Sequence, residues 1–173
     1  MPEPDWRITP LVVADCDELG RVHVRSWRET YAGLMPSAYL AGLSETRSAA
    51  YWRRLSEQPE GVDLGGLTLV ARRTGRIVGF ASAGPSRDTD APTEWELHVI
   101  NLLQDAHGLG LADLLLDRVL ADRDASLWVV EGNARARAFY TRRGFIDEGG
   151  RSVHEQTDAP EIRMVRRGSP SRP

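Results

Sequence analysis

A glycine-rich turn stands between two regular segments in the middle of the sequence. His107, Gly108, Leu109 and Gly110 follow an apolar run and precede a helix with leucines at helical spacing. A helix begins with about four unpaired N–H groups and a partial positive charge, and glycine lets that backbone approach an anion closely. The turn therefore predicts a phosphate-binding cradle, with an ordinary tight turn as the alternative.

A second pair of residues could act beside such an anion. Asn133 and Tyr140 stand seven residues apart, which returns them to nearly the same face of a helix. Asparagine at a helix start is usually a cap, and tyrosine next to an aromatic neighbour is usually part of a core. Each residue thus has a structural alternative to a role in chemistry.

Two titratable residues fall within one predicted strand. Glu96 and His98 are separated by a single residue, and alternation places both on one face with Ile100 and Leu102. A carboxylate among apolar neighbours needs a partner or a chemical task, unless the strand end is still in solvent. Glu96 is therefore a candidate for moving a proton.

Composition argues against several other classes of protein. The net charge of -3 over 173 residues predicts no nucleic-acid partner. All 22 basic residues are arginine, so there is no P-loop lysine, and Gly108 and Gly110 lack the third glycine of a dinucleotide fingerprint. The single cysteine, Cys16, excludes an internal disulfide, and no metal site is expected. No apolar run approaches the ~20 residues that span a membrane. Because the first residues show no secretory pattern, we expect a cytoplasmic protein.

Hydrophobic periodicity sets the expected elements. Strands are expected at residues 6–13, 67–73, 76–83, 95–103, 127–130, 144–147 and 161–167, with a hairpin at Thr74-Gly75. Helices are expected at residues 16–31 behind a capping Asp15, at 44–56, from the glycine turn to about 123, and at 133–143, and Pro36 marks the first turn of another. The order β-α-α-β-β-β-α-β-α-β-β predicts an α+β fold with a mixed sheet. One domain is expected over residues 1–173, with a disordered tail at 168–173.

Taken jointly, these segments resemble the GNAT N-acetyltransferases, in particular a common bacterial branch. Residues 96–100 (ELHVI) and 104–115 (QDAHGLGLADLL) resemble the acetyl-CoA-binding motif of that family. Residues 131–145 (EGNARARAFYTRRGF) resemble its second motif, N-x-x-A-x-x-F-Y-x-x-x-G-F, and residues 22–36 resemble the bacterial branch. The phosphate loop departs from the family pattern at His107, where arginine or glutamine is usual.

The resemblance implies a GNAT-like sheet, splayed at its centre and flanked by helices, that admits the pantetheine arm of acetyl-CoA. It implies that backbone N–H groups from His107 to Ala112 hold the pyrophosphate and that a strand N–H polarises the thioester carbonyl. The implied acetyl-CoA-binding residues are Ile100, Asn101, Leu102, His107, Gly108, Leu109, Gly110, Leu111, Ala112, Asn133, Ala136 and Tyr140.

The implied reaction is direct attack by a primary amine of a small molecule or peptide. An amine of pKa ~10.4 lies about 4.6 kcal/mol from its reactive neutral form at pH 7, whereas a thiol of pKa ~8.5 needs only about 2 kcal/mol to leave. A proton acceptor should therefore matter more than a donor. Glu96 is the expected base, with Glu131 and His98 as alternatives, and Tyr140 is the acid by family position.

The acceptor, the exact function and the oligomeric state are less well defined by the sequence. Trp27 and Tyr31 are expected to line the acceptor site, although a tryptophan at helical spacing is more often core. The alternative functions are a non-catalytic acyl-CoA-binding or sensor domain, and an acyltransferase that uses another acyl donor. The sequence does not identify the acceptor, and a homodimer is compatible with it.

Overall fold

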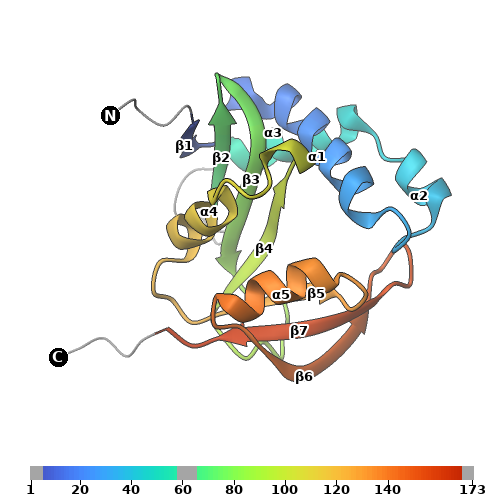
Figure 1. Ribbon diagram of the computed structural model, residues 1–173, viewed down its shortest axis with the longest axis vertical. Coiled ribbons are helices and arrows are strands. Elements are labelled where there is room, and N and C mark those ends of the chain that lie inside the picture. Colours follow the sequence, from blue (N-terminus) through green and yellow to red (C-terminus); the bar gives the residue numbers. More distant parts are fainter. Residues whose placement is uncertain (1–5, 58–65, 169–173) are drawn as a thin grey trace.

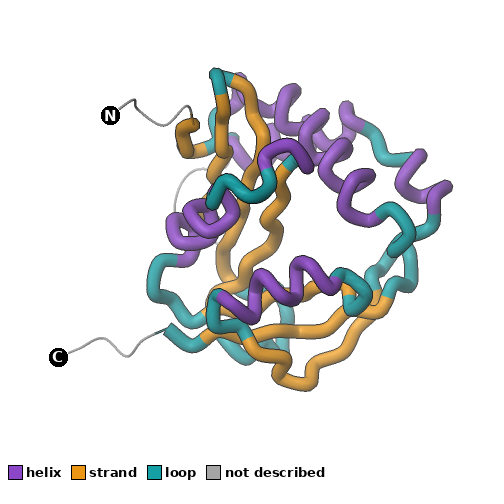
Figure 2. The backbone as a smooth tube through the Cα atoms, in the orientation of Figure 1, coloured by secondary structure: helices purple, strands orange, loops and turns teal. Residues whose placement is uncertain are grey.

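The computed structural model describes residues 6–57 and 66–168, which form a seven-stranded sheet with helices on both faces (Figures 1 and 2). The strands are β1 (Trp6–Pro10), β2 (Leu67–Arg73), β3 (Arg76–Pro85), β4 (Trp95–Leu102), β5 (Ala125–Val130), β6 (Ile146–Val153) and β7 (Pro160–Arg166). Their order in the sheet is β1-β2-β3-β4-β5-β7-β6. Neighbouring strands are antiparallel, except that β4 and β5 are parallel. The predicted tail, apart from Gly168, lies outside the described residues.

Five helices cover this sheet in the described part of the chain. They are α1 (Cys16–Tyr31), α2 (Ser37–Ala41), α3 (Glu45–Ser56), α4 (Leu111–Leu120) and α5 (Ala134–Arg142). Residues of α1 and α3 pack with Val70 and Phe80 on one face of the sheet. Residues of α4 and α5 pack with Leu69 and Ala81 on the other face. The α+β class is confirmed, with three helices rather than two between β1 and β2. None of the helices described here is long and apolar enough to cross a membrane.

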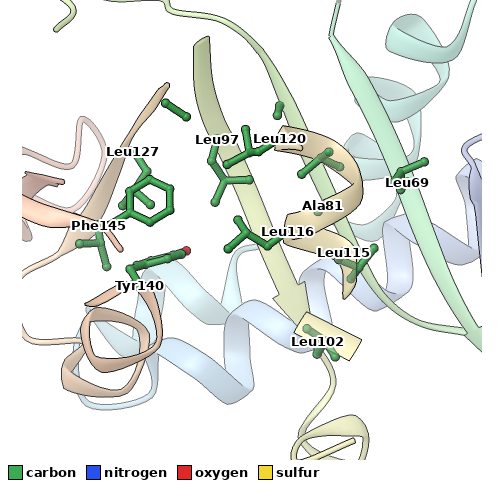
Figure 3. Close-up of a cluster of buried hydrophobic side chains, with 14 of the residues drawn as sticks. Leu69, Ala81, Leu97, Leu102, Leu115, Leu116, Leu120, Leu127, Tyr140 and Phe145 are labelled. Carbon is green, nitrogen blue, oxygen red and sulfur yellow. The ribbon is translucent and has the colours of Figure 1, made fainter. Parts of the chain in front are cut away.

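The core under α4 explains why the leucine-rich segment forms a helix there. Figure 3 shows Leu116 and Leu120 of α4 facing Leu97 of β4, and Leu115 belongs to the same buried cluster. These leucines recur at helical spacing, so one face of α4 is apolar and is removed from water as it packs. The packing fixes the start of α4, and with it the glycine turn, close to the end of β4.

Several boundaries differ from those expected from the sequence. β1 ends at Pro10, and the next residues turn into α1 through a 3₁₀ helix at Val13–Asp15. Asp15 makes no capping bond to α1 with its side chain. Its Oδ1 instead accepts from Arg72 Nη2 at 2.5 Å, which ties the start of α1 to β2. Pro36 precedes α2 as its N-cap rather than lying within its first turn.

The later elements show two further corrections. α4 ends at Leu120 rather than near residue 123, because Ala121 adopts a φ of 48° that a helix does not continue. β6 extends to Val153, well beyond the expected end at residue 147, and almost all its side chains are exposed. An edge strand of this kind has no buried face, so it carries no apolar alternation for a sequence pattern to detect.

The sheet splits between β4 and β5, as the resemblance implied. Only two residue pairs join these strands, Trp95 with Ala125 and Glu96 with Ser126. Beyond them the two strands diverge (Figure 1). The edge of β4 that faces β5 therefore has no strand partner from Leu97 to Leu102 among the described residues.

A β-bulge at His98 corrects the predicted alternation in β4. Val99 pairs with Ser82 and Leu97 pairs with Ala83, so His98 has no partner in β3. The extra residue shifts the phase of the strand. Consequently Leu97, Ile100 and Leu102 belong to the core under α4, whereas Val99 packs on the α1 side. Glu96 and His98 thus do not share one continuous face with Ile100 and Leu102.

His23 of α1 is enclosed by three aromatic rings. Its ring centroid lies 5.7 Å from that of Trp27, 5.5 Å from Trp52 and 5.2 Å from Phe80. Trp52 Nε1 donates to its Nδ1 at 3.1 Å. Burial lowers the pKa of His23 from 6.5 to about 4. The imidazole is therefore neutral in the folded protein at pH 7.

We expect the free energy of unfolding to fall between pH 6.5 and pH 4. In that window the unfolded chain protonates His23 and the folded chain does not, so acid favours unfolding by roughly 3 kcal/mol in total. Urea unfolding at pH 7.5, 5.5 and 4.0 measures this loss. The variant His23→Gln cannot titrate and should lose less stability over the same range. Equal pH slopes in the two proteins would contradict the assignment.

Candidate active site

A cleft of about 1440 Å³ opens where β4 and β5 part. It is lined from the glycine turn at one end to α1, α2 and the turn between β6 and β7 at the other. Of the residues singled out from the sequence as the site, all line the cleft except Leu109. Of the two alternative bases, His98 lines it and Glu131 does not.

The glycine turn presents unpaired backbone N–H groups to this cleft. Gly108 and Gly110 have φ angles of 77° and 73°, and no atom lies within 4 Å of a Cβ built on either. Among the described residues, no N–H from 108 to 113 has an acceptor. The His107 N–H differs, because it donates to Gln104 O at 3.2 Å. The run of N–H groups without an acceptor in the described chain thus begins at Gly108, one residue after the start of the segment expected from the sequence.

Arginines add positive charge at the same end of the cleft. Arg135 and Arg142 of α5 line it. Arg143 lies 3.6 Å from Asp113 of α4, so the C-terminal end of α5 sits beside the start of α4. A helix N-terminus, open glycines and nearby guanidinium groups form a site that fits a pyrophosphate.

Asn133 and Tyr140 combine the roles that the sequence left open. Asn133 Oδ1 accepts from Ala136 N at 3.1 Å, so this side chain caps α5 while it lines the cleft. The Tyr140 ring packs between Phe139 and Phe145, with centroids at 5.4 Å and 5.8 Å. Figure 3 shows its hydroxyl pointing away from Phe145. That hydroxyl has no hydrogen-bond partner within the described chain.

Burial raises the pKa of two tyrosines of the cleft, Tyr31 and Tyr140. Burial raises the pKa of Tyr140, and the neighbouring Tyr31 raises it further. Burial also raises the pKa of Tyr31 to about 12, with a second contribution from the negative charge of Glu161. Tyr140 is therefore a neutral phenol at pH 7, which can donate a proton but not accept one.

Glu96 is buried at the closed end of the split and is bound by Arg87. Its carboxylate Oε1 accepts from Arg87 Nη2 at 2.5 Å, and Oε2 accepts from Arg87 N at 3.0 Å. Only 3% of the Glu96 side chain is exposed, against 58% for Arg87. A carboxylate offers about four acceptor positions, so this ion pair leaves room for a bound water.

The loop that carries Arg87 is fastened to the second half of the sheet. Asp88 Oδ2 accepts from Trp128 Nε1 at 2.7 Å. Arg163 of β7 binds Asp90 at 3.2 Å and Glu148 of β6 at 2.5 Å, and its guanidinium lies 5.2 Å from the Trp128 ring. These contacts hold the loop between β3 and β4 across the closed end of the split.

The acceptor end of the cleft is aromatic. Trp27 and Tyr31 both line it, as expected from the sequence, and their ring centroids are 4.9 Å apart. With the Asn101 amide turned to satisfy both of its neighbours, its oxygen accepts from Trp27 Nε1 at 3.1 Å. Trp27 is thus anchored to β4 at the rim of the split. In the described residues, no group of three histidine, cysteine or acidic side chains could hold a metal.

Sequence reasoning did not single out Arg87, His154 and Glu161, which all line the cleft. Tyr39 also lines the cleft, and an aromatic residue so soon after residues 22–36 is a usable signal in the sequence. Arg87 and Glu161 stand in segments of mixed polarity, where nothing in the local pattern separates them from surface residues.

Known proteins share these features. The profile of the Acetyltransferase (GNAT) family matches residues 25–145. The uncharacterized N-acetyltransferase YuaI of Bacillus subtilis is 31% identical over 125 residues, which cover 69% of this chain and 68% of that protein.

Solved structures share the fold. A histone acetyltransferase HPA2-related protein of Corynebacterium glutamicum superposes with a TM-score of 0.69 at 21% identity, over 97% of this chain and 99% of that one. The PaiA N-acetyltransferase of Thermoplasma acidophilum, solved with coenzyme A, superposes with a TM-score of 0.67 at 20% identity, over 94% and 98%. The family match spans both the glycine turn and the Asn133–Tyr140 helix. This chain therefore belongs to the GNAT family of acetyltransferases, enzymes that use acetyl-CoA as co-substrate.

Proposed function

We propose that this protein transfers the acetyl group of acetyl-CoA to a primary amine of a small molecule or peptide by direct attack. The observation that carries the proposal is the cleft itself, which joins the open glycine turn to the unpartnered Tyr140 hydroxyl and the Glu96 carboxylate. A protein that only binds acyl-CoA needs neither of the last two groups. One domain, a cytoplasmic location and a homodimer remain predictions from the sequence.

The donor half would be held mainly by backbone groups. The N–H groups from Gly108 to Asp113 are without acceptors in the described chain and would bind the pyrophosphate. The open edge of β4 from Ile100 to Leu102 supplies main-chain groups for the pantetheine arm and a donor for the thioester carbonyl. The remaining residues that we place against acetyl-CoA are His107, Asn101, Asn133, Ala136 and Tyr140.

The chemistry follows from the groups at the split. The amine nitrogen forms a bond to the thioester carbonyl carbon, and the carbon–sulfur bond breaks as the tetrahedral intermediate collapses. Glu96 takes the proton lost by the amine through a water, while Arg87 fixes the carboxylate. Tyr140 gives its proton to the departing sulfur. The neutral amine loses one proton and the thiolate gains one, and exchange with solvent afterwards restores the Glu96 carboxylate and the Tyr140 phenol.

Two successive measurements test this function. Calorimetry should show an isotherm with acetyl-CoA and none with NAD or ATP. The sequence has neither the lysine of an ATP-binding P-loop nor the third glycine of a dinucleotide fingerprint. Release of free thiol from acetyl-CoA over a panel of primary amines should then exceed the amine-free rate. Binding without thiol release for any amine would favour a sensor, and binding of NAD alone would exclude the proposal.

We expect Tyr140→Phe to lower kcat by roughly 10–100-fold, since the leaving thiol needs only about 2 kcal/mol of help. Acetyl-CoA affinity should change little, because the ring stays packed between Phe139 and Phe145. Steady-state thiol release and calorimetry on the same preparation measure both. Full turnover in a variant whose chemical step limits the rate would assign the proton to water. A collapse of affinity would instead make the hydroxyl a binding group.

A further inference from the structure

Four aromatic rings gather at the acceptor end of the cleft, and we call them the aromatic box: Trp27 and Tyr31 of α1, Tyr39 of α2, and His154 of the turn between β6 and β7. The ring centroid of His154 lies 5.8 Å from that of Trp27 and 5.9 Å from that of Tyr39. The box is assembled from segments far apart in the chain. The faces of such rings attract organic cations.

Glu161 of β7 lines the same end of the cleft. It pairs with Val130 of β5, which packs in one apolar cluster with the first three rings of the box. No described residue donates a hydrogen bond to its carboxylate or forms an ion pair with it. Burial raises the pKa of Glu161, and the charge of Arg87 opposes that shift. A partly buried carboxylate without a close counter-ion favours a cationic ligand.

The other charges at this end do not neutralise Glu161. Arg87 is bound to Glu96 at 2.5 Å, and Asp88 lies 3.5 Å from Arg163. Burial lowers the pKa of three imidazoles that line the cleft, which are His23, His98 and His154. These rings are uncharged at neutral pH, so the half-buried Glu161 carboxylate, like the exposed Glu155 carboxylate beside His154, has no counter-ion among the described residues.

Glu161 enters the cleft from β7, opposite Val130 of β5, whereas Tyr140 enters it from α5 and Glu96 from β4. Tyr31 stands between the two regions electrostatically, because the charge of Glu161 raises the pKa of Tyr31 and Tyr31 raises that of Tyr140. A second nitrogen, joined to the attacking amine by a short chain, would lie beside Glu161.

We propose that Glu161 and the aromatic box bind a second, positively charged nitrogen of the acceptor, so that short aliphatic diamines and polyamines are preferred to monoamines. This inference rests on the proposed acetylation of amines. The carboxylate supplies the counter-ion, and the box supplies the aromatic faces and excludes water. An acceptor whose second group is a carboxylate is rejected, because it would meet Glu161.

The test compares each 1,n-diaminoalkane with the 1-aminoalkane of the same length, for chains of three to six carbons. We expect kcat/KM of the full chain to be roughly 10–100-fold higher for the best diamine than for its monoamine. In Glu161→Gln the ratio of the two values should fall towards one. In Asp158→Asn, which removes an exposed carboxylate from the turn between β6 and β7 but outside the cleft, the ratio should persist.

The outcomes distinguish a failure of the proposed diamine site from a failure of the proposed acetyltransferase function. A diamine preference that is lost in Glu161→Gln and kept in Asp158→Asn supports the site. Transfer to both series without a preference, or with a preference that Glu161→Gln leaves intact, overturns the inference alone. A Glu161→Gln variant that loses kcat equally for both series would make Glu161 a base and also overturn it. No transfer to any amine would overturn the proposed function with it.

Discussion

Replacing Glu96 by glutamine should lower kcat by roughly 10²–10⁴-fold at pH 7, while acetyl-CoA affinity stays nearly unchanged. The glutamine keeps an oxygen that can accept from Arg87 N, so the local fold is retained, but it cannot take the proton of the amine. The loss should shrink as the pH rises towards the pKa of the amine, because the neutral amine then needs no base. Thiol release from pH 6.5 to 9.5 measures the profile.

A matched control lies two residues earlier in the chain. Glu94 is exposed just before β4, and Glu94→Gln changes the same net charge without touching the cleft. It should leave kcat within about twofold of the parent, as is usual for a surface substitution. If the Glu96→Gln loss were the same at every pH, the carboxylate would serve only to hold Arg87. Arg87→Leu would then reproduce that loss.

Gly110→Asp should weaken acetyl-CoA binding by roughly 100-fold or more, about 2.7 kcal/mol. Gly110 is the N-cap of α4 and has a left-handed φ of 73°. An aspartate there adopts an unfavourable backbone conformation and places a negative charge where the pyrophosphate is expected. Calorimetry with acetyl-CoA measures the loss.

Two variants separate charge from backbone strain. Gly110→Ala imposes the same strain without the charge and should lose far less affinity. Gly149→Asp introduces the charge at a glycine of β6 with a φ of 98°, away from the cleft, and should not change affinity. An unaltered affinity in folded Gly110→Asp would place the phosphates elsewhere.

The donor half of the site could be predicted from the sequence because its signals are local. The glycine turn and the leucine spacing of α4 lie within a dozen neighbouring residues, and each has a direct physical meaning. The N-cap of α5 is equally local, since Asn133 binds a backbone group three residues later. These features need no knowledge of the rest of the chain.

The acceptor half could not be predicted in the same way, because long-range pairing builds it. Glu161 reaches the cleft only through the register that sets it opposite Val130. The bulge at His98 adds one residue to β4, and a histidine at that position does not indicate a bulge. Alternation counted through His98 therefore assigned Ile100 to the wrong face. The sequence predicts too early an end for β6 for a different reason: a strand exposed on both faces has no apolar alternation that marks its length.

The open edge of β4 makes occupancy of the cleft a contribution to folding as well as to catalysis. From Leu97 to Leu102 this edge has no strand partner in the described chain, and a pantetheine arm lying along it would act as a substitute strand. A ligand that binds only the folded state stabilises it by RT ln(1 + [L]/Kd), about 2.7 kcal/mol at one hundred times Kd. The melting temperature should therefore follow the supply of acetyl-CoA, and a shortage of acetyl donor should shorten the lifetime of the protein as well as slow its reaction.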